Sequence, residues 1–431
     1  MSKTKVLAYG DYCCSTGFAT VMGNILRELN STDKYEIDVI AINYDGGPYD
    51  REKWPGQVWP AISALRTQGP YGDLHGRQVF LDRLGQGDYD VVFIVQDTFI
   101  MLPITPQILE IQRNKPKSFS TIYYYPFDCA PKAEWVSQCV ASFDFPVAYT
   151  EYAKNESRKV IGDLADKHDV IYHGTNTNDF FPLSAEEKKE LKKGLFGDRA
   201  DRFIITNLNR NQGRKDVSRS FMILKELRNR GYNEPLLYMH MQESDFGGSI
   251  MQQSTNFGLS PETDFTIPNP QQFSAHMGFP IQVVNQLYNV SDVYLSTTHG
   301  EGWGLSITES MACKTPIVVP RNTSIPEIVG PNDERGWSVD SGVHPAQWII
   351  KDNDNDRVRP LMDVVKAADA IIEIMENKDN IVEKKTEAAL EWAQDLTWKK
   401  VMIDWKNVFN KAINKSKSAN LLKGGTVQWK Q

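Results

Sequence analysis

The chain has 431 residues, 41% of them hydrophobic and 24% charged, and its formal net charge at pH 7 is -7. This composition excludes a disordered chain, because enough apolar surface is present to offset the entropy lost on folding, and the length predicts two domains. The acidic balance argues against a generally basic surface for nucleic acid, although it leaves room for a local basic cleft.

The five cysteines show no CxxC or Cys/His ligand spacing, so the sequence predicts neither a disulfide framework nor a zinc site. The apolar stretch at the N-terminus is shorter than the core of a signal peptide. Nowhere does the chain contain the run of about 18 apolar residues that indicates a membrane-spanning helix. We therefore expect a cytoplasmic protein without a transmembrane segment.

Short β-rich runs alternate with helical patterns in the first half of the chain. The runs KVLAYG, YEIDVIAIN, YDVVFIVQD and FSTIYYYP each have the character of a buried strand. After the first run, one helical face gathers apolar side chains at three- and four-residue spacing: Phe18, Val21, Met22, Ile25, Leu26 and Leu29. Alternating strands and helices predict an α/β domain with a parallel sheet covered on both faces.

The pattern restarts after a polar, charged stretch at residues 182–202. The later strands FIITNLNR, PLLYMHM, DVYLST and TPIVVP predict a second doubly wound domain. We place the domains at residues 1–178 and 179–396, with the ligand cleft between two facing sheets. An apolar stripe in residues 397–413 predicts a helix that packs back onto the first domain, and residues 414–431 are expected to form a flexible tail.

The segment HGEGWGLSITE, residues 299–309, follows a predicted strand and begins a helix. Its glycines let the backbone approach a ligand closely and leave N–H groups at the helix start available to an anion. Glu301 and Glu309 could each accept hydrogen bonds from a pair of vicinal hydroxyls. Alternatively, they are a solvated loop charge and a charge on an exposed helix face.

Two further segments suit a phosphate. Arg210 and Lys215 follow a strand, and an arginine fork with a lysine point charge could neutralise the charge that grows on a departing diphosphate. The alternative is a polar loop whose charges meet water. Gly17 precedes the first helix, where N–H groups could bind a phosphate or an acceptor, or where small residues merely cap the helix.

Taken whole, HGEGWGLSITESMACKTPIVVPRNTSIPEIVG resembles the donor-site signature of family 4 glycosyltransferases of the GT-B fold, also called glycosyl transferases group 1. VIYHGTNTNDFFP at 170–182 resembles the end of the first domain in that family, and ITNLNRNQGRKD at 205–216 resembles its Arg-x4-Lys segment. The resemblance implies two facing Rossmann-like domains with a C-terminal helix that crosses back to the first.

By this resemblance, Glu309 would bind the ribose hydroxyls of the donor and Glu301 the hydroxyls of the transferred sugar. His299 could contact the donor as well, or be structural. Trp303 stands where the family often has phenylalanine and Lys314 where glycine is usual, so the sugar preference and one turn could differ. The donor would also lie against the backbone of four consecutive residues: Gly302, Trp303, Gly304 and Leu305.

Many members of the family place a histidine near the anomeric carbon of the sugar, at the end of the strand that here reads YYYPFDCAP. This chain has no histidine between His75 and His168 and offers Asp128 instead. Asp128 could replace the histidine as a polar contact to sugar or acceptor, or it could cap the following helix. Asp97 is the other carboxylate candidate.

The sequence thus predicts a retaining glycosyltransferase that moves a hexose or pentose from a nucleoside diphosphate-sugar to a hydroxyl acceptor. In the front-face mechanism that the resemblance implies, Arg210 and Lys215 stabilise the leaving diphosphate, with Glu301 and Asp128 as the other catalytic candidates. No metal or cofactor is expected, and DNDND at 352–356 is followed by arginine where a calcium loop requires glycine. The alternatives are a GT-B sugar-nucleotide epimerase and a non-catalytic nucleotide-sugar-binding protein.

The acceptor stays open among a glycan, a lipid-linked sugar, a protein and a modified base in DNA. Residues 238–248 and the region of Glu327 are expected near the donor base, whose identity also stays open. An insertion at residues 43–78 could read the acceptor through rings that stack on a sugar or an exposed base, or the same rings could pack the insertion together: Tyr49, Trp54, Trp59 and Tyr71.

Overall fold

The computed structural model describes residues 3–62, 73–261, 263–269, 278–351 and 354–424. The chain divides by its contacts into two compact units. Unit 1 comprises Met1–Pro126, Pro131–His173 and Trp398–Gln431, and unit 2 comprises Phe127–Ala130 and Gly174–Thr397. The passage from His173 to Gly174 comes a few residues before the boundary expected after residue 178.

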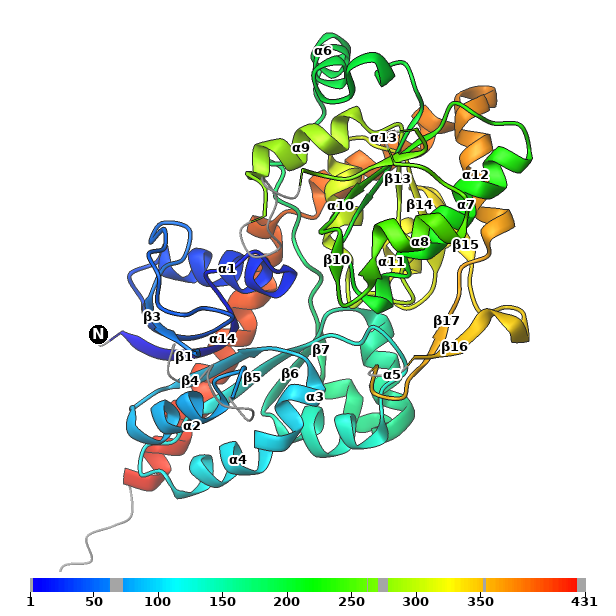
Figure 1. Ribbon diagram of the computed structural model, residues 1–431. Coiled ribbons are helices and arrows are strands. Elements are labelled where there is room, and N and C mark those ends of the chain that lie inside the picture. The colour runs from blue at the N-terminus through cyan, green and yellow to red at the C-terminus, as the bar shows by residue number, and fades with distance from the viewer. Residues whose placement is uncertain (1–2, 63–72, 262, 270–277, 352–353, 425–431) are drawn as a thin grey trace, which may run out of the picture. The chain divides into compact units, whose positions relative to one another are not determined.

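Unit 1 contains a parallel sheet with the strand order β3-β2-β1-β4-β5-β6-β7 (Figure 1). Every residue of β4 and β5 is buried, as expected of strands covered on both faces. Because neighbouring strands pair in parallel, their carboxyl ends lie at one edge of the sheet. The strands are Thr4–Asp11 (β1), Tyr35–Ile42 (β2), Gln57–Pro60 (β3), Val91–Val95 (β4), Ser120–Tyr125 (β5), Phe145–Ala148 (β6) and Asp169–Val170 (β7).

The first helix of unit 1 forms as the sequence predicts. The Thr16 hydroxyl accepts a hydrogen bond from the N–H of Ala19 at 3.1 Å and caps the helix, and the apolar face is buried from Val21 to Leu29. No helix in the described part of the chain combines the length and apolar character that a bilayer crossing requires. The helices of unit 1 are Gly17–Asn30 (α1), Arg77–Gln86 (α2), Thr98–Met101 (α3), Thr105–Asn114 (α4), Glu151–Ile161 (α5) and Trp398–Gly424 (α14).

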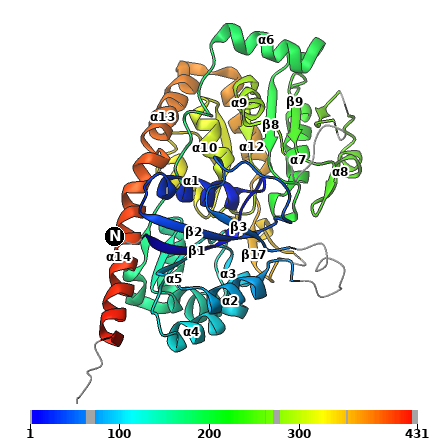
Figure 2. The ribbon, with the colours of Figure 1, turned by 90° about the vertical axis from the view of Figure 1, so that its left-hand side faces the viewer.

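The C-terminal helix is longer than predicted. Helix α14 continues to Gly424, so the expected flexible tail is wrong for residues 414–424, while residues 425–431 lie outside the described part of the chain. Polar contacts hold the added turns, because Ser118 and Asn420 exchange hydrogen bonds of 2.6 and 3.0 Å. Figure 2 shows α14 along its length, and its Trp405 ring packs on Phe93 of β4.

Unit 2 contains a second parallel sheet, with the order β12-β9-β8-β13-β14-β15. The order reverses between β8 and β13, which is the kind of switch point where doubly wound sheets bind ligands. A core of buried aliphatic and aromatic side chains packs α7 and α12 on this sheet. The strands are Ile204–Leu208 (β8), Leu236–His240 (β9), Phe265–Thr266 (β12), Val293–Leu295 (β13), Ile317–Arg321 (β14) and Trp337–Asp340 (β15).

Unit 2 also has two antiparallel hairpins. One pairs Ser244–Asp245 (β10) with Gly248–Ser249 (β11), and the other pairs Trp348–Ile350 (β16) with Val358–Pro360 (β17). The helices of unit 2 are Ala185–Phe196 (α6), Val217–Asn229 (α7), Ile250–Asn256 (α8), Ile281–Val290 (α9), Leu305–Ala312 (α10), Ile325–Val329 (α11), Val364–Glu376 (α12) and Ile381–Asp395 (α13).

The described part of the aromatic insertion packs against unit 1 itself. Trp54 is 7% exposed and meets Tyr12 edge-on, with ring centroids 4.8 Å apart. It lies so close to Gly23 that a Cβ there would come within 2.6 Å of its ring. The guanidinium of Arg83 lies 4.4 Å from the centre of the Trp59 ring. These contacts favour the packing alternative for both tryptophans, while Tyr71 lies outside the described residues.

Candidate active site

Six charged side chains meet at the carboxyl edge of the unit 2 sheet. They come from the loops after β8 and β13, from the segment Phe127–Ala130 and from the β16–β17 hairpin. The segment Phe127–Ala130 follows β5 in the chain yet groups with unit 2. We call these side chains the charge cluster: Asp128, Arg214, Lys215, Glu301, Asp354 and Arg359.

Glu301 joins the two basic residues of the β8 loop. Its Oε1 lies 2.5 Å from Lys215 Nζ, and its Oε2 lies 3.3 Å from Arg214 Nη1. The N–H of Glu301 donates to the Thr323 hydroxyl at 2.9 Å, so the main chain is fixed as well. Burial raises the pKa of Glu301, but Lys215 and Arg214 outweigh burial, and the pKa lies below its ordinary value. Glu301 is therefore a carboxylate at neutral pH.

Asp128 is bound on both carboxylate oxygens. Arg214 Nε lies 3.0 Å from Oδ2, and Arg359 Nη1 lies 3.0 Å from Oδ1. Burial raises the pKa of Asp128, whereas the two arginines lower it and prevail. Arg214 thus connects Asp128 and Glu301, which are two of the four predicted catalytic residues.

Two glycines of the motif, Gly300 and Gly304, are required for different structural reasons. A Cβ at position 300 would lie 2.0 Å from the carbonyl oxygen of Asp128, so no side chain fits beside this segment. Gly304 adopts φ of 107°, in the left-handed region where a side chain is strained. Gly304 is also the N-cap of α10, and no side chain caps that helix. The first N–H groups of α10, beginning at Leu305, therefore form a site where an anion is favoured.

Trp303 turns its side chain into unit 2. It is 3% exposed, and its ring stacks on Trp392 of α13 with centroids 6.3 Å apart. The sequence predicts that the donor lies against the backbone of Trp303 and of the half-buried Gly302. The inward orientation of the indole ring is compatible with that backbone contact. An influence of Trp303 on sugar preference stays a prediction.

Glu309 lies on α10 outside the charge cluster. It accepts a hydrogen bond from the Tyr288 hydroxyl at 2.8 Å. Burial raises the pKa of Glu309 to about 7, although the bond from Tyr288 opposes the rise. A carboxyl group that is partly protonated near neutral pH can both donate to and accept from hydroxyl groups.

His299 is buried rather than open to a ligand. Its side chain is fully enclosed, with Nε2 2.9 Å from Asp216 Oδ2, and its backbone N–H donates to the carbonyl of Arg214 at 2.9 Å. Asp216 is held in the left-handed region at φ of 45° and also accepts from Arg219 at 2.6 Å. These contacts favour the structural alternative for His299, which fixes the loop that carries Arg214 and Lys215.

Arg210 stands apart from the charge cluster in this structure. Its Nε lies 2.7 Å from Asp245 Oδ2, and its guanidinium lies 5.5 Å from the centre of the Phe246 ring. The Arg210 side chain is 47% exposed. The structure therefore does not bring Arg210 together with Lys215. Gly17 belongs to unit 1, as the first residue of α1, and its predicted contact stays a prediction.

Two arginines of the charge cluster, Arg214 and Arg359, were not predicted from the sequence. Arg214 and Lys215 end a single 3-10 turn, Gly213–Lys215, and both reach Glu301. Two successive basic residues before the helix were a usable signal for Arg214. Arg359 lies 50 residues after Glu309, the last residue of the glycine-rich motif, and no local pattern marks it.

Metal-ligating side chains do not gather in the described residues. No group of three or more His, Cys, Asp or Glu side chains there is placed to hold a metal ion. Asp352 and Asn353 of the DNDND segment lie outside the described part of the chain, and Asp354 pairs with Arg359 at 2.7 Å. Metal independence stays a prediction.

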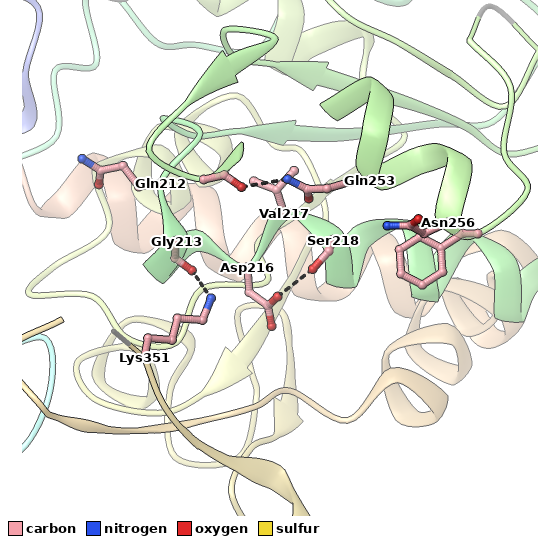
Figure 3. A pocket seen from close by; sticks show the side chains of 10 residues that line it. Gln212, Gly213, Asp216, Val217, Ser218, Gln253, Asn256 and Lys351 are labelled. Atoms are coloured by element: carbon pink, nitrogen blue, oxygen red, sulfur yellow. Dashed lines mark hydrogen bonds between the residues drawn. The ribbon is translucent and has the colours of Figure 1, made fainter. Parts of the chain in front are cut away.

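A cavity of about 350 Å³ lies against the start of α7 (Figure 3). Within it, Lys351 donates to the carbonyl of Gly213 at 2.5 Å and Asp216 accepts from the Ser218 hydroxyl at 3.1 Å. No side chain of the charge cluster lines this cavity, and neither does Glu309. The cavity is therefore distinct from the predicted donor pocket.

The comparisons with known proteins agree with the motif. Residues 274–356 match the family model described as Glycosyl transferases group 1. The chain is 26% identical over 236 residues to a probable sucrose-phosphate synthase of Thermosipho melanesiensis, which covers 54% of this chain and 51% of that protein. The chain thus spans about half the length of the curated relative it matches.

Solved structures share the fold over nearly the whole chain. HepE of Anabaena in complex with UDP has a TM-score of 0.66 and 16% identity, covering 95% of this chain and 100% of that chain. Sucrose-phosphate synthase from Thermosynechococcus elongatus has a TM-score of 0.72 and 14% identity, with coverage of 95% and 99%. At these identities the likeness shows the fold alone. With its two Rossmann-like units, the chain has the GT-B fold and is similar to glycosyl transferases group 1, which indicates a transferase.

Proposed function

We propose that this protein is a retaining, family 4 type glycosyltransferase that moves a sugar from a nucleoside diphosphate-sugar to a hydroxyl acceptor. The observation that carries the proposal is the charge cluster at the switch point of the unit 2 sheet, next to the uncapped start of α10. Buried charges are costly to the fold, and clusters of them often mark functional sites. HepE structures contain UDP and UDP-glucose, so a UDP-sugar is the first donor to test.

In this proposal the diphosphate binds at the first turn of α10 and is neutralised by Lys215 and Arg214. The cluster itself pairs its cations with carboxylates, so a diphosphate adds negative charge that needs a further cation. Arg210 is half-exposed and held by the single carboxylate of Asp245, and rotation about its side chain would supply that cation. Glu301 then accepts from the hydroxyls of the transferred sugar.

The proposed chemistry proceeds on one face of the sugar. The bond between the anomeric carbon and the diphosphate oxygen breaks, and the acceptor oxygen attacks from the same face. The acceptor's proton passes to the departing diphosphate oxygen, which balances the step and retains the configuration. Asp128 is a weak base because its pKa is low, so it is suited to hold a hydroxyl or to stabilise positive charge on the sugar rather than to remove a proton.

The experiment that tests the function is nucleoside diphosphate release from UDP-, GDP-, ADP- and dTDP-sugars, with and without glycan, lipid-linked, peptide and DNA acceptors. Lys215→Met removes the buried cation, and we expect it to lower release by about 100-fold or more. Lys225→Met is the matched control, because Lys225 is exposed on α7 and should leave release unchanged. Chelation of divalent metals should also leave release unchanged.

Each other outcome points to a different function. Isomerised donor without acceptor would identify an epimerase. Donor binding without turnover across all acceptor classes would favour a nucleotide-sugar-binding protein. If no nucleotide sugar binds, the assignment of HGEGWGLSITE as a donor site is wrong.

A further inference from the structure

Arg359 carries a buried charge that none of the sequence motifs includes. It lies on β17 and is 3% exposed. A guanidinium stays ionised in proteins, and taking it out of water is costly unless carboxylates and carbonyls satisfy it. Its Nε and Nη2 bind the two oxygens of Asp354 at 2.7 and 2.8 Å, which forms a bidentate pair.

The remaining Arg359 nitrogen is directed at Asp128. Nη1 donates to the Asp128 carbonyl at 2.5 Å and lies 3.0 Å from its Oδ1. One guanidinium nitrogen therefore fixes both the main chain and the side-chain rotamer of Asp128. The carbonyl that it binds is the same one that excludes a side chain at Gly300, so Arg359 holds this segment against the glycine-rich motif.

The consequence extends beyond Asp128. Arg214 is shared between Asp128 Oδ2 at 3.0 Å and Glu301 Oε2 at 3.3 Å. Without Arg359, Arg214 would be the remaining cation of the cluster beside Asp128. The ion pair between Arg214 and Glu301 would then weaken. Arg359 thus acts on Glu301 through two intervening side chains.

We infer that Arg359 is a positioning residue for this site, which fixes Asp128 and thereby keeps Arg214 divided between Asp128 and Glu301. This inference rests on the proposed function, because it assigns Arg359 a part in the same reaction. Arg359 touches no predicted donor group and is not a catalytic residue. Its bidentate fork is what the geometry requires, so lysine, a point charge, replaces it poorly.

The test compares Arg359→Lys with a matched variant, Arg228→Lys. Arg228 is also largely buried, binds the carbonyl of Pro235 at 2.7 Å and pairs with Asp264, but it lies where β9 and β12 begin, at the opposite edge of the sheet. We expect Arg359→Lys to lower kcat by about 10- to 100-fold with the donor KM within about 2-fold, because misplacement by about 1 Å has costs of that order. Arg228→Lys should lower the unfolding temperature similarly and leave kcat unchanged.

A double-mutant cycle tests the contact without relying on activity. Arg359→Gln, Asp128→Asn and the double variant are compared by unfolding temperature and by kcat. We expect the double variant to lose less than the sum of the single losses in both quantities. Asp354 loses its partner in both variants that lack Arg359, so this loss cancels in the cycle. If Arg359→Gln unfolds, Arg359→Lys takes its place in the cycle.

The outcomes separate the inference from the proposed function. Normal kcat in folded Arg359→Lys, or additive losses in kcat, would overturn the positioning role while the function stands. If the native chain turns over no donor but the unfolding temperatures show coupling, the proposed function fails and the contact stands. Equal losses of kcat in Arg359→Lys and Arg228→Lys would mean that Arg359 serves stability alone, which also overturns the inference.

Discussion

At the carboxyl edge of the unit 2 sheet, carboxylates are paired with arginine and lysine, whereas at the same edge of the unit 1 sheet the carboxylate of Asp11 is held by neutral groups. Asp11 ends β1 and is 5% exposed. It accepts from the Thr16 hydroxyl at 2.7 Å, the Asn43 amide at 3.1 Å and the Gln96 amide at 3.4 Å. Burial raises the pKa of Asp11 although these bonds oppose the rise.

The two edges differ in the charge state that they maintain. Lys215 and Arg214 keep the pKa of Glu301 low, so the ion pairs at the unit 2 edge stay charged at neutral pH. At the unit 1 edge, neutral hydroxyl and amide groups surround the carboxyl group of Asp11, and burial disfavours its charge. Similar topology therefore supports different chemistry at the two edges.

The same carboxylate-to-amide change in each unit gives the largest expected contrast. Glu301→Gln leaves Lys215 and Arg214 without their shared carboxylate, and breaking a buried pair costs about 3 to 5 kcal/mol. Asp11→Asn keeps one oxygen that can accept from the Thr16 hydroxyl and the Asn43 amide, and loses only the long 3.4 Å bond from Gln96, so the free energy of unfolding should change by about 1 kcal/mol. Urea unfolding measures both. Equal losses of unfolding free energy in the two variants would mean that ion pairing does not distinguish the two edges.

Glu309→Gln tests a carboxyl group of the unit 2 motif whose pKa, like that of Asp11, is raised by burial. The pKa of Glu309 is about 7 in the folded chain against an ordinary 4.5, so the folded chain binds its proton more tightly than the unfolded chain. Stability from this group is complete below pH 4.5 and is lost as the pH rises through 7. Glutamine avoids that loss, so the variant should be more stable than the native chain at pH 8, by on the order of 3 kcal/mol.

This gap should close as the pH falls toward 4.5, as followed by thermal unfolding across the pH range. The control is Glu391→Gln on the exposed face of α13, which should leave the pH dependence as it is in the native chain. A gap that does not change with pH would mean that burial does not perturb Glu309.

The sequence predicts most of the fold and about half of the local arrangement of this site. Glu301 and Lys215 could be found because both lie in short loops that follow strands of one parallel sheet, and such loops meet at one edge. Their bond is a consequence of that topology. Arg359 could not be found, because its contact with Asp128 joins segments far apart in the chain, and its hairpin carries no motif.

Arg210 and Arg214 show a second limit. Both precede a helix in one loop, and sequence spacing does not fix which way their side chains leave it. The 3-10 turn Gly213–Lys215 directs Arg214 to Glu301, while Asp245 holds Arg210 on the hairpin. The length of α14 was missed for a similar reason, because Asn420 finds its partner Ser118 only in the folded unit.

Asp245→Asn sharpens the comparison by freeing a cation for the charged edge. If Arg210 joins the diphosphate, the Asp245 carboxylate competes with the donor for it. Removing an exposed pair of this kind changes a binding free energy by about 0.2 to 1 kcal/mol, so the donor Kd should fall by up to about 5-fold. Titration calorimetry with the active nucleotide sugar measures this change. Arg210→Ala in the same background should abolish the gain, and an unchanged Kd in Asp245→Asn would leave Arg210 without a part in donor binding.

Lys314→Gly gives the smallest expected effect, in a turn of unit 2 away from the charged edge. Lys314 follows α10 at φ of 59°, the left-handed region where glycine carries no steric cost and a side chain costs about 1 kcal/mol. The resemblance to the family places glycine at this position, and the strain explains why glycine suits it. The strain of the lysine is offset in part by an ion pair with Glu387, but both side chains are more than a third exposed, so that pair contributes little.

Lys314→Gly should therefore raise the free energy of unfolding by about 0.5 kcal/mol, whereas Lys314→Ala, which loses the pair and keeps the strain, should lower it slightly. Since neither variant reaches the charge cluster, nucleoside diphosphate release should be unchanged in both, and a glycine variant no more stable than the alanine variant would show that the turn is not strained.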